Sequence, residues 1–285
     1  MREAAGSAGC ARSHVSAVAW NLYHGRDKPP GREPYTWRSR LLRVTERSAT
    51  HVQVNRPLLN EFAAFIDSLD WQVALLQEAP PRWLEALALR SQASAALGLT
   101  SRNWLPAARR ALARRNPDLI ASNDGGSNMV LVRSPGAIEA VERVTLARKP
   151  ERRAMLMTRV RLPGGEPLAV ASMHLSVPET GQSAGELVKA AERAVRFAGD
   201  LPLLLGGDLN LREAEVPGAF EEVRQRFGLA GPTAPRAIDH LLVRGLDVVS
   251  APVALAAAKR ELREPGGLAL RLSDHAPVTA SFRMR

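Results

Sequence analysis

At 285 residues the chain can bury one large hydrophobic core, and its 45% apolar and 24% charged residues are those of an ordinary globular protein. A single cysteine, Cys10, excludes an internal disulfide framework, and no run approaches the roughly 20 apolar residues that a membrane span requires. The net charge of +10 favours an anionic partner, although nearly all the basic residues are arginine, which a GC-rich genome also explains.

The chain contains no internal repeat and no low-complexity linker, which favours a single domain. Residues 1–15 form a short tail without the apolar run of a signal peptide, so we expect a cytoplasmic protein. Residues 16–285 form the domain, with an insertion at about 25–56 that is rich in Gly, Pro, Arg and Thr. We predict that this insertion is a long surface loop with one helical turn, and that the protein is a monomer.

Hydrophobic periodicity predicts more strands than helices. In chain order, the predicted strands are 15–23, 71–78, 128–133, 154–162, 168–175, 202–210, 237–245, 246–255 and 276–284. The predicted helices are 57–69, 80–90, 103–116, 183–199 and 218–228. Tight turns such as 163–167 link neighbouring strands, so much of the sheet should be antiparallel. The pattern favours an α/β protein in which packed sheets are covered by helices.

Polar residues recur where these apolar strands end. They are Asn21, Glu78, Asn128, His174, Asp208, Asn210, Asp239, Asp274 and His275. Each alone is explained as readily by a turn, a solvated strand end or a satisfied core histidine. Because they recur at the end of strand after strand, they predict that these polar side chains cluster at one site. Burying such a cluster is costly unless it binds a cation or performs chemistry.

The strand that ends in "LLLGGDLNL" shows the pattern most clearly. Asp208 and Asn210 are two residues apart, so on an extended chain both side chains leave the same face. By contrast, His240 alternates away from Asp239 on its strand. The other histidines outside the pattern, His14, His24 and His51, have no supporting context in the sequence.

The residue types suit one kind of chemistry. Glu78 and Asp274, with the amide oxygen of Asn21, form a hard oxygen-ligand set suited to Mg²⁺ or Mn²⁺, whereas scattered histidines and one cysteine disfavour zinc. Two histidines with nearby carboxylates provide acid–base groups that titrate near neutral pH. A hard cation beside a His–Asp pair suits the hydrolysis of a phosphate ester by an activated water.

Seven short motifs occur in a fixed order: "WNL", "LLQE", "SNMVLV", "SMHLS", "GGDLN", "IDHLLV" and "SDHAPV". Together, across residues 18–284, they resemble the endonuclease/exonuclease/phosphatase superfamily, which includes DNase I-like nucleases, sphingomyelinases and inositol-polyphosphate phosphatases. The resemblance implies a four-layer α-β-β-α sandwich of two packed, mixed, largely antiparallel sheets. It also implies that the two glycines of "GGDLN" let the backbone approach the scissile phosphate.

The resemblance assigns metal and substrate contacts residue by residue. Glu78 is the expected main metal ligand, aided by Asn21 and Asp274, with Mg²⁺ or Mn²⁺ as the cofactor. Asn128 is expected to contact a phosphate oxygen. Arg153 is a further candidate for binding phosphate, although a solvated arginine explains it equally well.

The resemblance also assigns catalytic roles. Asp208 is expected to orient or deprotonate the attacking water, with Asn210 holding that water or a phosphate oxygen. His275, oriented by Asp239, is expected to stabilise the pentacovalent phosphate. His174 is expected to act as general acid for the leaving oxygen or as a hydrogen-bond donor to the phosphate.

Three hypotheses for the function remain. The first is a Mg²⁺-dependent nuclease acting on DNA or RNA, favoured by the net charge and by a basic helix face of Arg109, Arg110, Arg114 and Arg115 beside Trp104. The second is a phosphatase or phosphodiesterase acting on a phospholipid head group, an inositol phosphate or another small phosphate ester. The third is a catalytically inactive binding module, which the complete set of polar positions disfavours. "QE" is followed here by Ala79 and Pro80, unlike the pattern of apurinic endonucleases, so the substrate is open.

Overall fold

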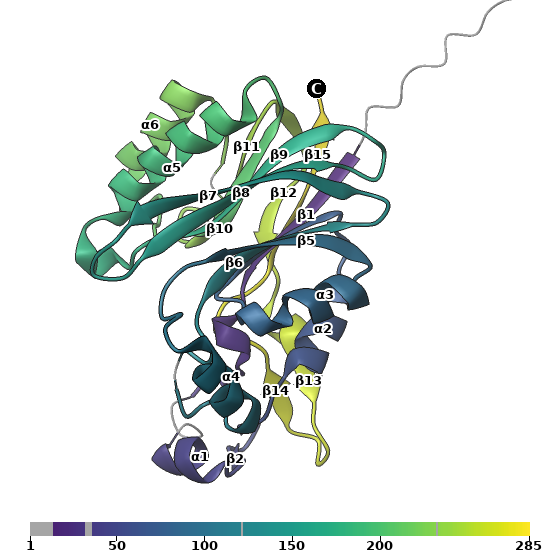
Figure 1. The fold of residues 1–285 in the computed structure, drawn as a ribbon, viewed down its shortest axis with the longest axis vertical. Helices are drawn as coiled ribbons and strands as arrows, with labels where there is room; N and C mark the ends of the chain where they lie inside the picture. Colours follow the sequence, from purple (N-terminus) through teal and green to yellow (C-terminus); the bar gives the residue numbers. More distant parts are fainter. Residues whose placement is uncertain (1–13, 32–35, 121, 232) are drawn as a thin grey trace, which may run out of the picture.

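The computed structural model describes residues 14–31, 36–120, 122–231 and 233–285, in which the apolar runs of the sequence form the strands of two packed sheets (Figure 1). The predicted tail, residues 1–15, lies outside the described residues except for its last two, which already belong to the first strand. Among the described residues, no helix is long and apolar enough to cross a membrane.

The first sheet has six strands in the order β12-β15-β1-β4-β6-β5. In that order they span Leu246–Ala254, Val278–Met284, His14–Asn21, Val73–Gln77, Ser127–Arg133 and Ala93–Leu99. β1 and β4 run parallel, with Asn21 opposite Gln77, and the other pairs are antiparallel. The central strands are buried along almost their whole length, as expected for strands covered on both faces.

The second sheet has five strands in the order β11-β10-β9-β8-β7. In that order they span Asp239–Arg244, Leu203–Asp208, Pro167–His174, Arg153–Arg161 and Ala137–Ala147. β10 and β9 run parallel, with Asp208 opposite His174, and the other pairs are antiparallel. Each sheet therefore contains one parallel pair, and in each pair the two carboxyl ends lie side by side at one edge.

Helices cover the outer faces of the two sheets and complete four layers (Figure 1). α2 (Leu59–Ser68) and α3 (Leu84–Arg90) cover the first sheet, where Phe62 and Phe65 pack against Trp20. α5 (Ser183–Ala198) and α6 (Pro217–Phe227) cover the second sheet. A third apolar cluster fills the space between the sheets. This arrangement confirms the predicted four-layer α/β sandwich.

Short elements lie beyond the carboxyl ends of the parallel strands, around the lower part of the molecule in Figure 1. The helices there are α1 (Trp37–Leu42) and α4 (Pro106–Arg115), and the small strands are β2 (Glu46–Arg47), β3 (Val52–Gln53), β13 (Glu261–Arg263) and β14 (Ala269–Arg271). Single 3₁₀ turns occur at Tyr23–Gly25, Pro81–Trp83, Pro178–Thr180 and Ala257–Arg260.

The predicted surface loop at 25–56 is confirmed in its middle and wrong at its two ends: residues 36–50 are mostly exposed and contain the expected helical turn as α1, whereas 25–29 and 51–55 are mostly buried. Its polar residues Arg26, Asp27 and Gln53 are each at most 3% exposed. They are buried because partners within the fold satisfy them: the Arg26 guanidinium lies 3.1 Å from the Asp118 carboxylate, and Gln53 Nε2 donates to Asp118 Oδ2 at 2.6 Å. Polar composition alone does not reveal such internal pairing.

Two strands of the main sheets escaped the sequence prediction, as did the short strands β2, β3, β13 and β14. β5 (Ala93–Leu99) consists of Ala, Ser, Leu and Gly, without the β-branched and aromatic residues that mark a strand. β7 (Ala137–Ala147) carries several exposed charged side chains because it is the edge of its sheet. Both strands form through pairing with a neighbouring strand, so their own sequences are poor indicators of strand structure.

Candidate active site

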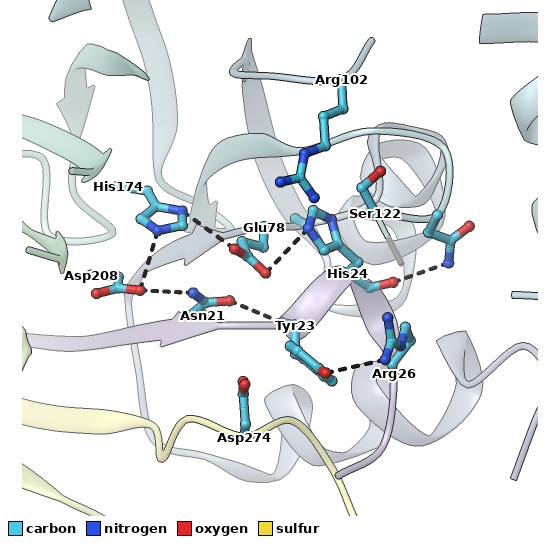
Figure 2. Close-up of polar contacts among 12 residues, drawn as sticks. Asn21, Tyr23, His24, Arg26, Glu78, Arg102, Ser122, His174, Asp208 and Asp274 are labelled. Atoms are coloured by element: carbon cyan, nitrogen blue, oxygen red, sulfur yellow. Dashed lines mark hydrogen bonds and ion pairs between the residues drawn. The ribbon is translucent and has the colours of Figure 1, made fainter. Parts of the chain in front are cut away.

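The carboxyl ends of the two parallel strand pairs meet at a cavity of about 500 Å³ between the sheets. Eight of the predicted site residues line this cavity: Asn21, Glu78, Arg153, His174, Asp208, Asn210, Asp274 and His275. Asp239 lies behind the wall and contacts it through His275. The fold thus gathers polar residues that are far apart in the sequence, and Figure 2 shows Asn21, Asp208, His174 and Glu78 joined by polar contacts, with Asp274 nearby.

Asp208 lies at the centre of the cavity floor. Its Oδ2 accepts a hydrogen bond from Asn21 Nδ2 at 2.9 Å and faces the Nε2 atoms of His174 at 3.4 Å and His275 at 3.7 Å. Its Oδ1 accepts from the backbone N–H of Asn210 at 3.1 Å. The residue is only 2% exposed, and this burial raises the pKa of its carboxyl. Asp208 of the second sheet therefore bonds to Asn21 of the first sheet and lies close to both histidines.

His275 forms a pair with Asp239. Nδ1 of His275 lies 2.8 Å from Asp239 Oδ2, and the His275 backbone is held by Trp20 and Ser273. Burial opposes a charge on the ring, but the hydrogen bond and charge of Asp239 prevail and raise the pKa of His275 to about 10. The imidazole is therefore protonated at neutral pH, with Nε2 directed to Asp208.

His174 differs from His275 in its charge. It ends β9 with a side chain that is only 7% exposed, and burial lowers its pKa to about 3, although Asp208 opposes that effect. The ring is therefore neutral at physiological pH. Its Nδ1 lies 3.7 Å from Glu78 Oε1, so it bridges the two carboxylates of the cavity.

Glu78 follows β4 directly and lies between two imidazoles. Its Oε2 is 3.3 Å from His24 Nε2, on the side opposite His174 (Figure 2). Burial, followed by the nearby charge of Asp274, raises the pKa of Glu78 to about 7. A divalent cation stabilises two carboxylates that repel each other in one cavity. The oxygen donors of Glu78, Asp274 and Asn21 therefore suit a hard cation.

A second group of potential ligand atoms comes from Asp208, Asp239 and His275, which lie within 4.8 Å of one another. To bind a metal, its imidazole would first have to give up a proton, because the hydrogen bond and charge of Asp239 raise its pKa to about 10 against the effect of burial. The Glu78 side of the cavity is therefore the better fit for a cation.

Several backbone positions around the cavity are strained. Tyr23, His24, Glu78, Asn210 and Ser273 all have φ between 47° and 57° without being glycine. Such left-handed conformations persist only where the surrounding structure enforces them, and they concentrate at functional sites. Asn210 reaches the cavity for a different reason from the one that the sequence suggested. β10 ends at Asp208, so the left-handed backbone at Asn210, and not strand alternation, places this side chain beside Asp208.

The glycines before Asp208 serve the packing of strands. Gly207 has a φ of +133°, and a Cβ atom there would lie 2.1 Å from the Met173 backbone oxygen and 2.9 Å from the Gln77 amide. A Cβ on Gly206 would lie 2.6 Å from the His240 backbone oxygen. The structure places these glycines against neighbouring strands and against the first sheet, which corrects the expectation that they let the backbone approach a phosphate.

Two further expectations need correction. Asn128 is fully buried and absent from the cavity wall, and its Nδ2 donates to the Ala154 backbone oxygen at 2.6 Å, so it is not placed to contact a phosphate. Arg109 is 4% exposed and donates to Ser122 Oγ and the Asn123 backbone oxygen, so it is not part of an exposed basic face. The pattern of polar and charged residues in a sequence does not show which of them the fold will bury.

The residues of the cavity wall that sequence reasoning missed include Tyr23, His24 and Arg102. His24 carries no sequence signal beyond its position three residues after Asn21, because a left-handed turn brings it back over Glu78. Arg102 pairs with Glu151 across the cavity mouth. By contrast, His240 is buried, contacts the Leu211 carbonyl and packs on Phe220, in agreement with its exclusion from the site.

Both the sequence and the fold resemble known proteins. The family model described as Endonuclease/Exonuclease/phosphatase family matches residues 18–275. An endonuclease/exonuclease/phosphatase from Beutenbergia cavernae has a TM-score of 0.64 at 20% identity, with 96% of this chain and 72% of that chain covered. A comparison with curated protein sequences yields no match.

Two further solved structures carry more specific names. The mannosyl-6-phosphatase of Bacteroides thetaiotaomicron has a TM-score of 0.62 at 13% identity, covering 94% of this chain and 99% of that one. Truncated TDP2 of Caenorhabditis elegans has a TM-score of 0.53 at 15% identity, covering 95% of this chain and 97% of that one. At these identities the likeness shows a shared fold.

Proposed function

The chain belongs to the endonuclease/exonuclease/phosphatase family, and we propose that it is a divalent-metal-dependent hydrolase of phosphate esters. One observation carries the proposal: a single cavity holds the carboxylates Glu78 and Asp274 on one side and Asp208 between two histidines on the other. The first side suits a cation and the second suits the activation of water.

A bound cation would be held by Glu78 and Asp274, with Asn21 contributing its amide oxygen. Asn21 Oδ1 already accepts from the Tyr23 backbone N–H at 2.9 Å, but an amide oxygen keeps a second lone pair. When bound, the cation supplies a Lewis acid that polarises the phosphoryl oxygens. Mg²⁺ and Mn²⁺ suit these oxygen donors best.

Asp208 is the proposed base for the attacking water. Its raised pKa increases its affinity for the proton that the water gives up, and the bonds from Asn21 and Asn210 fix both carboxylate oxygens. Asn210, which also lines the cavity, is proposed to hold the water or a phosphate oxygen.

The two histidines are proposed to act on the phosphate in different ways. His275, protonated and held by Asp239, would donate from Nε2 to the oxygens on which charge builds up. His174 is neutral at physiological pH, which favours its proposed role as a hydrogen-bond donor to the phosphate over that of a general acid. Arg153, 8% exposed in the wall, is proposed to contact the phosphate.

Nucleic acid is the first candidate substrate. Segments 100–102 and 150–153 line the cavity mouth, and the chain that continues from them carries exposed cations. These are Arg102, Arg110, Arg114, Arg115, Arg148, Lys149 and Arg152. A track of cations that leads to the cavity would attract a polyanion and guide its backbone.

A small phosphate ester is the second candidate, because the cavity is compact and the Arg102–Glu151 pair lies at its mouth. A structural neighbour named as a mannosyl-6-phosphatase shares this fold. A compact cavity suits a ligand with a single phosphate group better than a long polymer.

The experiment is a substrate panel with Mg²⁺ or Mn²⁺: DNA, RNA, a nitrophenyl phosphate monoester and diester, inositol phosphates and phospholipid head groups. We expect turnover that EDTA abolishes and that Asp208→Asn lowers by about 10² to 10⁴. Asp247→Asn, which changes a partly exposed Asp that pairs with Arg285 and does not line the cavity, is the matched control and should retain activity. Full turnover in EDTA, or from Asp208→Asn, would refute the proposal.

A further inference from the structure

His24 contacts the proposed cation site but has no role in the chemistry described so far. Its Nε2 lies 3.3 Å from Glu78 Oε2, and both residues line the cavity. The residue is only 9% exposed. Figure 2 shows His24 and His174 on opposite sides of the Glu78 carboxylate. The pair His24–Glu78 therefore offers one nitrogen and one oxygen donor at a single point of the wall.

The protein holds His24 in place with a dedicated set of contacts. Its backbone is left-handed, with φ of 53°, and its carbonyl accepts from Asn123 Nδ2 at 3.0 Å. Asn123 in turn accepts from Arg82 Nη1 at 2.8 Å, and Arg82 pairs with Asp124 at 2.6 Å. A strained conformation maintained by buried polar contacts is typical of a functional residue.

The two imidazoles beside Glu78 differ in which nitrogen atoms are free. His174 has one nitrogen directed at Asp208, at 3.4 Å, and the other at Glu78, at 3.7 Å. In His24, Nδ1 is buried without a hydrogen-bond partner in the described part of the chain, and Nε2 alone points to the carboxylate. No competing contact of the ring among the described residues therefore turns Nε2 of His24 away from Glu78.

We propose that His24 Nε2 is a ligand of the divalent cation together with Glu78, so that the site prefers Mn²⁺ to Mg²⁺. This inference rests on the proposed function, because it concerns the same cation. Two ligand atoms at right angles on bonds of about 2.1 Å lie about 3.0 Å apart, close to the observed 3.3 Å. Imidazole nitrogen suits transition ions, whereas Mg²⁺ favours an all-oxygen set.

The test is electron spin echo envelope modulation of Mn²⁺ bound to the intact protein, which detects a directly bound imidazole nitrogen. We expect nitrogen coupling in the wild type and its loss in His24→Asn, a residue that tolerates the left-handed backbone. His174→Gln is the matched control and should retain the coupling. Calorimetry should show that His24→Asn weakens Mn²⁺ binding by about 10-fold or more and Mg²⁺ binding less.

Each outcome decides the inference. Bound Mn²⁺ without nitrogen coupling, or coupling that survives in His24→Asn, overturns it, while phosphate-ester turnover measured in parallel leaves the proposed function intact. Failure of any divalent cation to bind overturns both. If His24→Asn does not fold, the His174→Gln/His275→Gln double variant, in which His24 is the remaining histidine of the cavity wall, decides: retained coupling supports His24 as the ligand, and lost coupling overturns it.

Discussion

Replacing Gly207 with alanine should destabilise the protein by about 4 kcal/mol. Two costs contribute. The φ of +133° lies in a region that only glycine adopts readily, which costs about 1–3 kcal/mol for another residue. The added Cβ would also lie 2.1 Å from the Met173 backbone oxygen, and overpacking costs about 1–3 kcal/mol.

The overlap cannot be relieved cheaply because the obstructing atom belongs to the backbone. Gly207 pairs with Met173 in the parallel β9–β10 ladder, one residue before the Asp208–His174 pair. Moving β10 away from β9 would shift Asp208 relative to both histidines. Gly207→Ala should therefore lose activity as well as stability.

Urea denaturation of three variants separates the two costs. Gly218→Ala has open space and no positive φ, so its unfolding free energy should stay within about 1 kcal/mol of the wild type. Gly165→Ala has open space but a φ of +98°, so it should show the backbone cost alone. If Gly207→Ala were no less stable than Gly165→Ala, the reasoning from strand packing would be refuted.

Three further predictions concern the site and its surface. Glu78→Gln should weaken Mn²⁺ and Mg²⁺ binding in calorimetry while leaving the urea midpoint nearly unchanged, because the carboxylate repels Asp274 and faces the cavity; undiminished binding would move the cation elsewhere. His275→Ala should lower kcat by about 10² to 10⁴, and Asp239→Asn by less, since Asp239 acts only through the ring; the reverse order would show that the pair is misassigned. If nucleic acid is the substrate, Arg110→Ala/Arg114→Ala should reduce the slope of log affinity against log salt by about 0.7 to 0.9 for each phosphate that the variant no longer neutralises. An unchanged slope would show that this helix takes no part in binding.

Much of the architecture was predictable because it depends on local pattern. Apolar runs define the buried strands and the covering helices, and the polar residues that end these runs lie where parallel strands bring their carboxyl ends together. The order of the seven motifs then pointed to the family and its four-layer fold, which the structure and the family match confirm.

What the sequence left open depends on contacts between distant segments. Asn128 and Arg109 have the same residue types as true surface groups, yet packing buries both and gives each a partner inside the fold. The edge strand β7 and the Ala-rich β5 are strands only because a neighbour pairs with them.

By itself, therefore, the sequence determined most of the strands of the two main sheets and of the helices that cover them, and that a set of carboxylates, amides and histidines ends the strands. The tertiary structure alone decided which of those groups share the cavity. It gave Asp208 two imidazoles of opposite charge state, since Asp239 stabilises the cation of His275 whereas burial keeps His174 neutral. It also brought His24 to Glu78 through a left-handed turn that no local pattern reveals, because the contacts enforcing it come from segments about 100 residues away.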